Sequence, residues 1–192
     1  MHNTLAQLIA ERRTVKPDTF TGEIIPDTQI KEILEQANWA PTHGYTEPWR
    51  FVVYQGEALK SLGRFMADYD QPNKEAEDFN EIRYNKLLNK PLLTSHVIGI
   101  AMKPNSNPKI PEIEESCAVA MAVQNMWLYI HSLGYGAIWS TPGFAFSDAF
   151  RSFMQFDETH KSMGLLYIGK PSKTNPVGRR LSTIENKVRW ES

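Results

Sequence analysis

Two adjacent arginines followed by a threonine stand near the start of the chain, at Arg12, Arg13 and Thr14. Arginine offers N–H donors in a fixed fork and threonine adds a short hydroxyl, and together they suit a phosphate group. Two arginines are equally expected without a ligand where a helix ends, because cations are favourable at a helix C-terminus. The spacing alone therefore leaves a phosphate site and a solvated helix end as two open interpretations.

Two further segments combine small, polar and aromatic residues in a way that suits a ligand-binding loop. In the segment 39–49, a predicted helix stops at Pro41 and a loop containing His43 leads into a strand. In the segment 134–143, glycines and other small residues permit a close approach of the backbone to a ligand. An ordinary aromatic-rich connection and a tight packing turn have the same composition, so these alternatives stay open as well.

The motifs of several other chemistries are missing from the sequence. There is no P-loop, no dinucleotide-binding glycine pattern and no Gly-x-Ser-x-Gly nucleophile elbow. The five histidines are far apart and lack the spacing of metal ligands, so we expect no metal site. The one cysteine, Cys117, lies in an apolar stretch and is expected to be a small buried hydrophobe, not a redox centre.

The composition describes a chain that can form an ordinary core. Its 192 residues are 41% hydrophobic and carry a formal charge of -1, which predicts one domain and argues against a dedicated nucleic-acid or anionic-membrane binder. The N-terminus lacks the apolar centre of a secretory signal, and the most apolar stretch, 117–133, is shorter than the ~20 apolar residues of a spanning helix. We therefore expect a cytoplasmic protein.

Hydrophobic periodicity and helix breakers predict mixed α+β structure in a single domain without repeats or linkers. The segment 73–89 is charged and favours a helix, but its thin apolar content suggests a mobile helical flap. Strands are predicted at 49–54, 95–102, 135–141 and 164–169, and the other helices at 5–13, 27–40, 58–70, 111–133 and 147–156.

The long helix predicted at 111–133 is apolar on nearly every face from residue 117 to residue 129. Such a pattern indicates burial all round, which a chain of this size rarely provides for so long a helix. A homodimer packed along this helix would supply the missing cover, so we expect a homodimer.

Taken in order, four motifs resemble the nitroreductase family of FMN-dependent oxidoreductases. They are Arg-Arg-Thr, then Ala-Pro-Thr-His with Glu-Pro-Trp-Arg-Phe-Val-Val, then Gly-Tyr-Gly-Ala-Ile-Trp-Ser-Thr, and finally Leu-Tyr-Ile-Gly-Lys-Pro. The resemblance covers nearly the whole chain and is closest to the compact branch with an Ala-Pro-x-His motif. It implies a nitroreductase-like fold, with a central, mostly antiparallel sheet flanked by helices and a dimer built around the long helix.

The resemblance also implies which residues bind FMN, with the flavin site at the subunit interface. The phosphate and ribityl chain would be held by Arg12, Arg13 and Thr14, with a C-terminal basic residue, Arg179 or Arg180, closing on the phosphate from a C-terminal arm at 171–192. The residues implied to lie along the flavin are Trp39, Pro41, Thr42 and His43, and also Trp139, Ser140 and Thr141, which the resemblance implies approach from the other subunit. No side chain is implied to be catalytic, because the flavin carries the chemistry.

The implied activity is ping-pong reduction of nitroaromatic, quinone or similar electron-poor acceptors, with NAD(P)H as the hydride donor. Three departures from the family pattern bear on the flavin contacts and on substrate preference: Glu47 stands where glutamine is more usual, the common asparagine of the second loop is absent, and Pro142 interrupts the small-residue run. Glu47 and the missing asparagine keep open a non-catalytic flavin-binding module. A flavin-dependent dehydrogenase or dehalogenase on the same fold is a further alternative.

Overall fold

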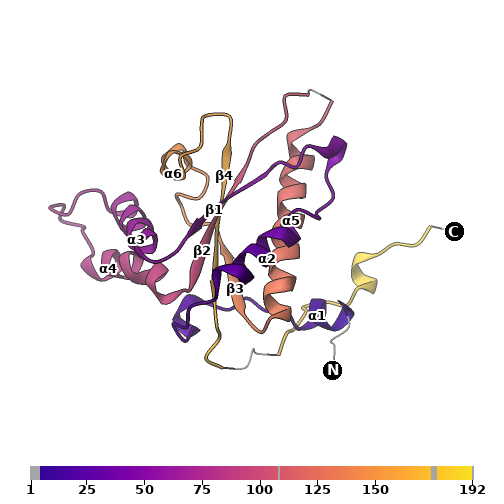
Figure 1. The fold of residues 1–192 in the computed structure, drawn as a ribbon, viewed down its shortest axis with the longest axis horizontal. Helices are drawn as coiled ribbons and strands as arrows, with labels where there is room; N and C mark the ends of the chain where they lie inside the picture. Colours follow the sequence, from indigo (N-terminus) through magenta and orange to yellow (C-terminus); the bar gives the residue numbers. More distant parts are fainter. Residues whose placement is uncertain (1–4, 108, 174–176, 192) are drawn as a thin grey trace.

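The computed structural model describes residues 5–107, 109–173 and 177–191, which form one α+β domain around a four-stranded sheet (Figure 1). The strands are β1 (Trp49–Tyr54), β2 (His96–Met102), β3 (Gly136–Ser140) and β4 (Lys161–Gly169). They follow the order β1-β2-β4-β3, and every neighbouring pair is antiparallel. The predicted fold class and antiparallel sheet are thereby confirmed.

Helices cover both faces of this sheet. On one face lie α2 (Asp27–Ala37) and α5 (Glu112–Ser132), and on the other lie α3 (Glu57–Asp70) and α6 (Asp148–Phe153), as Figure 1 shows. Helix α4 (Glu81–Asn89) packs on α3, and the short α1 (Leu5–Glu11) lies against α5. Short 3-10 turns at Pro17–Thr19 (η1), His43–Tyr45 (η2), Lys90–Leu93 (η3) and Glu185–Lys187 (η4) complete the elements of the described residues.

Strand β2 is buried along its whole length because it pairs on both edges and is covered on both faces. Successive side chains of a strand point to opposite faces. Ile98 and Ile100 accordingly join the core beneath α2 and α5, whereas Val97 and Ala101 join the aromatic core beneath α3 and α6. A continuous apolar run in the sequence thus becomes the centre of two cores.

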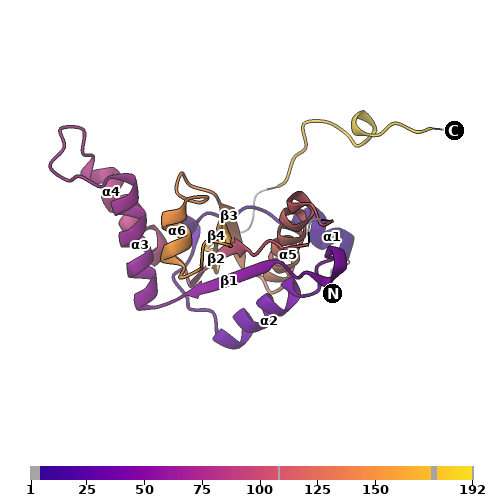
Figure 2. The ribbon, with the colours of Figure 1, turned by 90° about the horizontal axis from the view of Figure 1, so that it is seen from above.

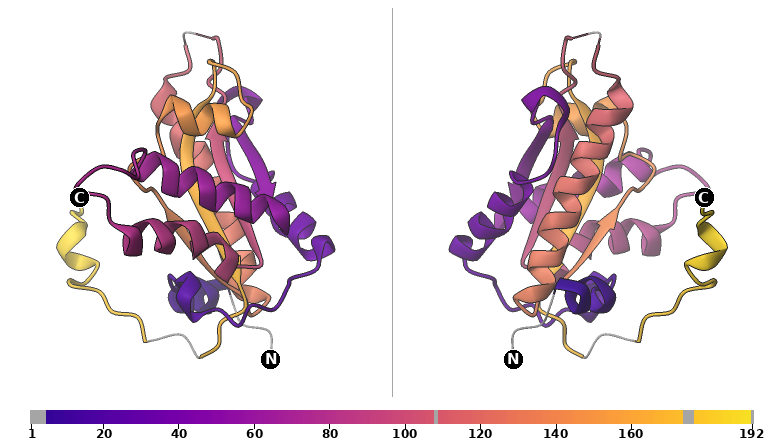
Figure 3. Two further views of the ribbon diagram at one scale, coloured as in Figure 1. Left: turned by 90° about the vertical axis from the view of Figure 1, so that its left-hand side faces the viewer. Right: turned by 90° about the vertical axis from the view of Figure 1, so that its right-hand side faces the viewer.

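Helix α5 begins and ends close to the predicted limits. Three acidic residues occupy its first turn, where they favour the helix dipole, and Gly134 follows its end with φ of 80°, a conformation that favours glycine. One face of α5 nevertheless remains uncovered: Ile113 is 68% exposed and Met121 39% exposed, one on each side of the exposed Cys117. The right-hand view of Figure 3 looks onto this helix.

The prediction that Cys117 is buried is therefore wrong for the single chain. Cys117 lies four residues from both Ile113 and Met121, so the 3.6-residue turn of the helix places all three on the outward face, away from the sheet. The uncovered face of α5 agrees with the expectation that one chain of this size does not cover the whole helix. The homodimer remains a prediction.

Other boundaries differ modestly from the sequence-based ones. Only Glu81–Asn89 of the predicted helix at 73–89 is helical, and β4 begins at Lys161 instead of residue 164. Among the described residues, no helix is both long and apolar enough to cross a membrane. The predicted C-terminal arm includes residues 174–176 and 192, which lie outside the described residues. Of its described parts, 171–173 bridges to the segment at Thr19 and Phe20, and 177–191 passes Arg13 at Gly178 before it runs away from the body of the domain (Figure 2).

Candidate functional site

Three guanidinium groups come together where α1 ends. Arg12 lies with its guanidinium carbon 4.3 Å from the centre of the Trp127 ring on α5, a cation–π arrangement. The pKa of Arg12 is lowered by burial first, and then by the positive charges of Arg13 and Arg180. The structure thus places Arg180 of the C-terminal arm near the N-terminal arginine pair.

The Arg12 side chain also carries an atom with unused hydrogen-bonding capacity. Its Nη1 is buried and has no hydrogen-bond partner among the described residues. Buried donors are normally satisfied, so this atom fits a ligand that presents acceptor oxygens. A phosphate group supplies such oxygens together with the negative charge that three neighbouring guanidiniums need.

The Arg13 side chain is held by hydrogen bonds to nearby backbone carbonyls. Its Nη1 donates to the carbonyl oxygens of Ala10 at 2.7 Å and Arg12 at 2.8 Å. The arm crosses it so closely at Gly178 that a Cβ there would lie 2.0 Å from Arg13 Nη2. Glycine at position 178 therefore lets the arm lie directly on the arginine pair and brings Arg179 and Arg180 to it.

Beyond the arginines, the chain runs alongside β3. Thr14 forms an isolated parallel bridge with Ala137, and the Val15 amide donates to the Ala137 carbonyl at 3.0 Å. A Cβ on Gly136 would lie 2.8 Å from the Val15 Cβ, so this close approach requires glycine. The exposed Thr14 is thereby held between the arginine cluster and the start of β3.

A cavity of about 870 Å³ lies next to this segment, between η1, α4, η3 and β3. Its volume falls within the usual range for small-molecule sites, roughly 300–1,000 Å³. The lining is apolar with a basic rim: Lys16, Pro17, Asp18, Ile82, Arg83, Asn85, Lys86, Leu87, Asn89, Lys90, Leu93 and Ile138.

Lys90 is a half-buried cation in the lining of this cavity. Its ammonium lies 4.7 Å from the centre of the Tyr167 ring, and its pKa is lowered by burial first and then by Lys86. Lys16 reaches the same cavity from the segment that carries Arg12 and Arg13. Sequence reasoning missed both lysines, because a lysine three residues after an arginine pair and one just after a charged helix carry no distinguishing signal.

A second group of predicted residues lies elsewhere, against the N-terminal half of α5. Pro41, Thr42 and His43 line a hollow of about 330 Å³ together with the outward face of α5. His43 Nδ1 lies 2.6 Å from Oε2 of Glu114 in the first turn of that helix. This contact joins the loop after α2 to the start of α5.

The backbone of this loop is unusual. Tyr45 and Glu47 have φ of 57° and 44°, in the left-handed region that costs a residue with a side chain about 1–2 kcal/mol. The Tyr45 side chain is 91% exposed and that of Trp39, at the end of α2, is 76% exposed. Strained backbone and exposed aromatic rings next to an uncovered helix face are typical of a surface that receives a partner or ligand.

The predicted site residues therefore form two groups toward opposite ends of α5 in one chain, and a third set lies at the end of β3. Glu114, beside His43, and Trp127, beside Arg12, are thirteen residues apart on α5, which is about 20 Å along the helix axis. One chain does not bring these groups together. Trp139, Ser140 and Thr141 lie at the end of β3, where the Trp139 indole N–H donates to the Met163 carbonyl at 3.0 Å and its ring packs on the core.

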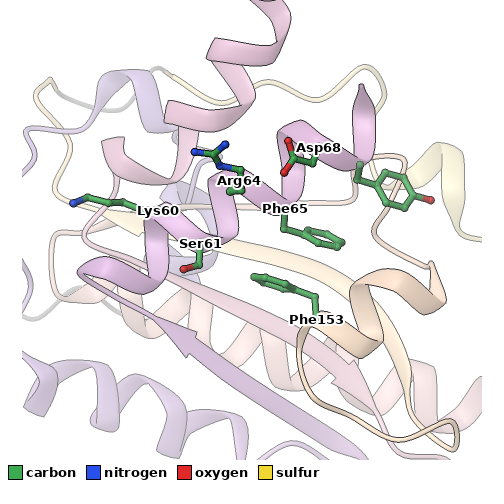
Figure 4. A pocket seen from close by; sticks show the side chains of 7 residues that line it. Lys60, Ser61, Arg64, Phe65, Asp68 and Phe153 are labelled. Carbon is green, nitrogen blue, oxygen red and sulfur yellow. The ribbon is translucent and has the colours of Figure 1, made fainter. Parts of the chain in front are cut away.

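Figure 4 shows a separate groove of about 700 Å³ between α3 and α6. Its floor is the stacked pair Phe65 and Phe153, with ring centres 4.5 Å apart, and Lys60, Arg64 and Asp68 line its polar rim. None of the predicted site residues lines this groove. Across the described part of the chain, no group of three or more potential ligands could hold a metal ion.

These features define a class of protein: an α+β domain with a basic cluster suited to a phosphate-bearing ligand beside a basic, apolar-lined cavity. The sequence model of the nitroreductase family matches residues 9–170. The chain belongs to the nitroreductase family, and the resemblance found in the sequence is confirmed.

Relatives of known sequence or structure agree with this assignment. The chain is 30% identical to the Escherichia coli (strain K12) protein named "Putative NAD(P)H nitroreductase YdjA" over 151 residues, 79% of this chain and 78% of the relative. A nitroreductase-like family protein from Bacillus cereus superposes with a TM-score of 0.85 at 27% identity, covering 100% of this chain and 97% of that one. The FMN- and NADPH-dependent nitroreductase NfnB superposes with a TM-score of 0.78 at 16% identity, covering 99% and 100%, and at that identity shows the fold alone.

Proposed function

We propose that this protein is an FMN-dependent oxidoreductase that takes hydride from NAD(P)H and reduces nitroaromatic, quinone or similar electron-poor acceptors. One observation carries the proposal: an arginine cluster with an unsatisfied buried donor lies at one end of a chain segment whose other end lines a basic, apolar cavity. A nucleotide with a phosphate at one end and a flat, electron-accepting ring at the other fits this arrangement.

The phosphate end belongs at the arginines. Arg12, Arg13 and Arg180 would neutralise its charge, and Thr14 would offer its hydroxyl to the ribityl chain. Arg180 is favoured over Arg179 for this role because its charge acts on Arg12. From Arg13 to Pro17 the chain spans at most about 13 Å, so the same segment also reaches the ring end.

The ring end belongs in the cavity. Lys16 and Lys90 would face the negative charge that develops on a reduced flavin, and the partial burial of Lys90 strengthens its interaction with that charge. Ile138 and Leu87 would supply apolar contact with the ring. When bound, FMN supplies the chemistry by accepting a hydride and delivering it to the acceptor.

We further propose that the active unit is a homodimer packed along the outward face of α5. Two copies of α5 in antiparallel contact near Met121 would bring the loop at Pro41, Thr42 and His43 of one subunit toward the arginine cluster of the other. Trp39 would approach the flavin of the other subunit in the same way. The uncovered apolar face of α5 and the 20 Å separation of the two groups in one chain support this arrangement.

No side chain is assigned as a catalytic acid or base. The cavity is open to solvent at its basic rim, so water can deliver protons. One cavity serves first NAD(P)H and then the acceptor, which gives ping-pong kinetics. Steady-state rates at several fixed acceptor concentrations test this: parallel double-reciprocal lines support the proposal, and intersecting lines contradict the ping-pong order.

Two other outcomes would redirect the functional assignment. Protein that binds FMN but oxidises neither NADH nor NADPH with any acceptor would be a non-catalytic flavin-binding module. Protein whose flavin is reduced by a small organic substrate, or reoxidised only by a halogenated one, would be a dehydrogenase or dehalogenase on this fold.

A further inference from the structure

Two α5 side chains that the proposed function leaves unused face the arginine cluster. Trp127 and His131 are four residues apart, so they lie one above the other on the same side of the helix. Arg12 lies over the Trp127 ring, and His131 is close enough to Glu11, Arg12 and Arg13 for all three charges to act on it.

Like Arg12, each of these two side chains has a buried polar atom that makes no hydrogen bond within the described residues. In the described residues, Trp127 Nε1 and His131 Nε2 are both buried and have no hydrogen-bond partner, and Arg12 Nη1 is buried and unpartnered beside them. Leaving even one such donor unsatisfied costs free energy, and most buried polar side-chain atoms in proteins are paired. Arg12 lies over the Trp127 ring and its charge acts on His131, so a ligand with several acceptor oxygens matches these three atoms.

We propose that Trp127 Nε1 and His131 Nε2 donate hydrogen bonds to the phosphate group of the bound flavin nucleotide, and that His131 takes up a proton from solvent when this phosphate binds. The proposal rests on the proposed function, because it assumes that the arginine cluster holds the FMN phosphate. It adds two ligands from α5 and a dependence of cofactor affinity on pH.

The electrostatics around His131 explain the proton uptake. Without the phosphate, the pKa of His131 is lowered, first by burial; Arg12 and Arg13 lower it further, and only Glu11 raises it. From the arm, Arg180 adds positive charge at Arg12. A phosphate carries close to two negative charges above its second pKa of about 6, and this charge next to the imidazole favours its protonated form. Binding therefore raises the pKa of His131.

The sign of the pH effect follows from linkage. A group that gains a proton on binding makes binding weaker as the pH rises between its pKa in the free protein and its pKa in the complex. The affinity for FMN should therefore fall as the pH rises above about 6.5, by at most about tenfold per pH unit. Riboflavin, which has the same ring system but no phosphate, should show no such dependence.

The test uses the full-length protein freed of flavin, with FMN and riboflavin as the two probes. Dissociation constants are measured by flavin fluorescence from pH 6.5 to 8.5 for the wild type, Trp127→Phe, His131→Gln and the control His160→Gln. His160 pairs with Asp157 at the start of β4 and serves as a histidine outside the site. Calorimetry in two buffers of different ionisation enthalpy measures protons taken up at pH 7.

We expect Trp127→Phe, which keeps a ring under Arg12 but removes the N–H, to weaken FMN about tenfold and leave riboflavin unchanged. His131→Gln should abolish both the pH dependence and the proton uptake, whereas His160→Gln should behave as the wild type. If His131→Gln does not fold, proton uptake by the wild type with FMN and its absence with riboflavin decide the question.

Three results would overturn the inference. They are equal losses of FMN and riboflavin affinity in Trp127→Phe, FMN affinity in the wild type that does not change with pH, and binding of FMN without proton uptake. Failure of the proposed function looks different, because the wild type would then bind neither flavin at any pH.

Discussion

Replacing Gly63 by alanine tests the packing that holds the cavity wall. A Cβ at position 63 of α3 would lie 2.1 Å from the carbonyl oxygen of Leu88 on α4, whereas ordinary contact begins at 3.4 Å. The opposing atom is backbone, so α4 itself must retreat. Overpacking of this kind costs about 1–3 kcal/mol, and the gain in helix propensity from glycine to alanine returns about 1 kcal/mol. Because a separation of 2.1 Å is far inside ordinary contact, the overpacking cost should lie near the top of this range, about 3 kcal/mol. After the gain in helix propensity is subtracted, we expect a net destabilisation of about 2 kcal/mol.

Thermal unfolding measures this change directly. For a chain of this size 1 kcal/mol corresponds to about 2–4 °C, so Tm should fall by about 4–8 °C. Leu87 and Lys90 would move with α4, so FMN affinity should fall as well. The matched control is Gly143→Ala, because a Cβ there meets nothing within 4 Å and should leave Tm unchanged. A Gly63→Ala protein as stable as the wild type would refute the packing argument.

Three further perturbations test other parts of the account. Arg12→Ala should weaken FMN binding about tenfold or more with little loss of stability, since a hydrogen bond to a charged group is worth about 1.5–3 kcal/mol; unchanged FMN affinity in a fluorescence titration would remove Arg12 from the phosphate site. Burial lowers the pKa of His96 in the folded state below the ordinary value of 6.5, so the unfolded chain binds the proton first as the pH falls. The free energy of unfolding in urea should therefore decrease between pH 7 and pH 5.5, and by less in His96→Gln; equal decreases would contradict this. Met121→Glu places a charge on the outward face of α5 and should give a folded monomer in sedimentation that binds FMN poorly, whereas an unchanged dimer would exclude that face as the interface.

Local signals were sufficient to predict most of the helices and strands. The three acidic residues after Pro111 and the glycine at position 134 delimit α5, and the aromatic and β-branched run from Trp49 to Tyr54 is β1. The start of β4 could not be predicted in this way. Met163 is an extra residue in a β-bulge opposite Ile100 and Ala101, and its carbonyl is used by the Trp139 indole, a contact set by tertiary packing.

The candidate site was predictable only where residues follow one another in the chain. Arg12 and Arg13 stand out as a pair, and the resemblance to the family led to Arg180. Lys90, Trp127 and His131 were missed because each lies within a helix or turn whose sequence explains it without any ligand. Only the fold brings α5 and the arm to the arginine cluster, and η3 to the cavity. The exposure of Cys117 was missed for a similar reason, since an apolar helix does not reveal which face remains uncovered.

The central claim is that this chain holds a flavin that moves electrons from a nicotinamide nucleotide to an electron-poor acceptor. The most direct measurement is the visible absorbance of the FMN-loaded protein under anaerobic conditions, before and after NADH or NADPH and then after a nitroaromatic or quinone. We predict that one or both nucleotides bleach the flavin band and that the acceptor restores it. A colourless protein that cannot be loaded with FMN, or a bound flavin that neither nucleotide bleaches, would contradict the account.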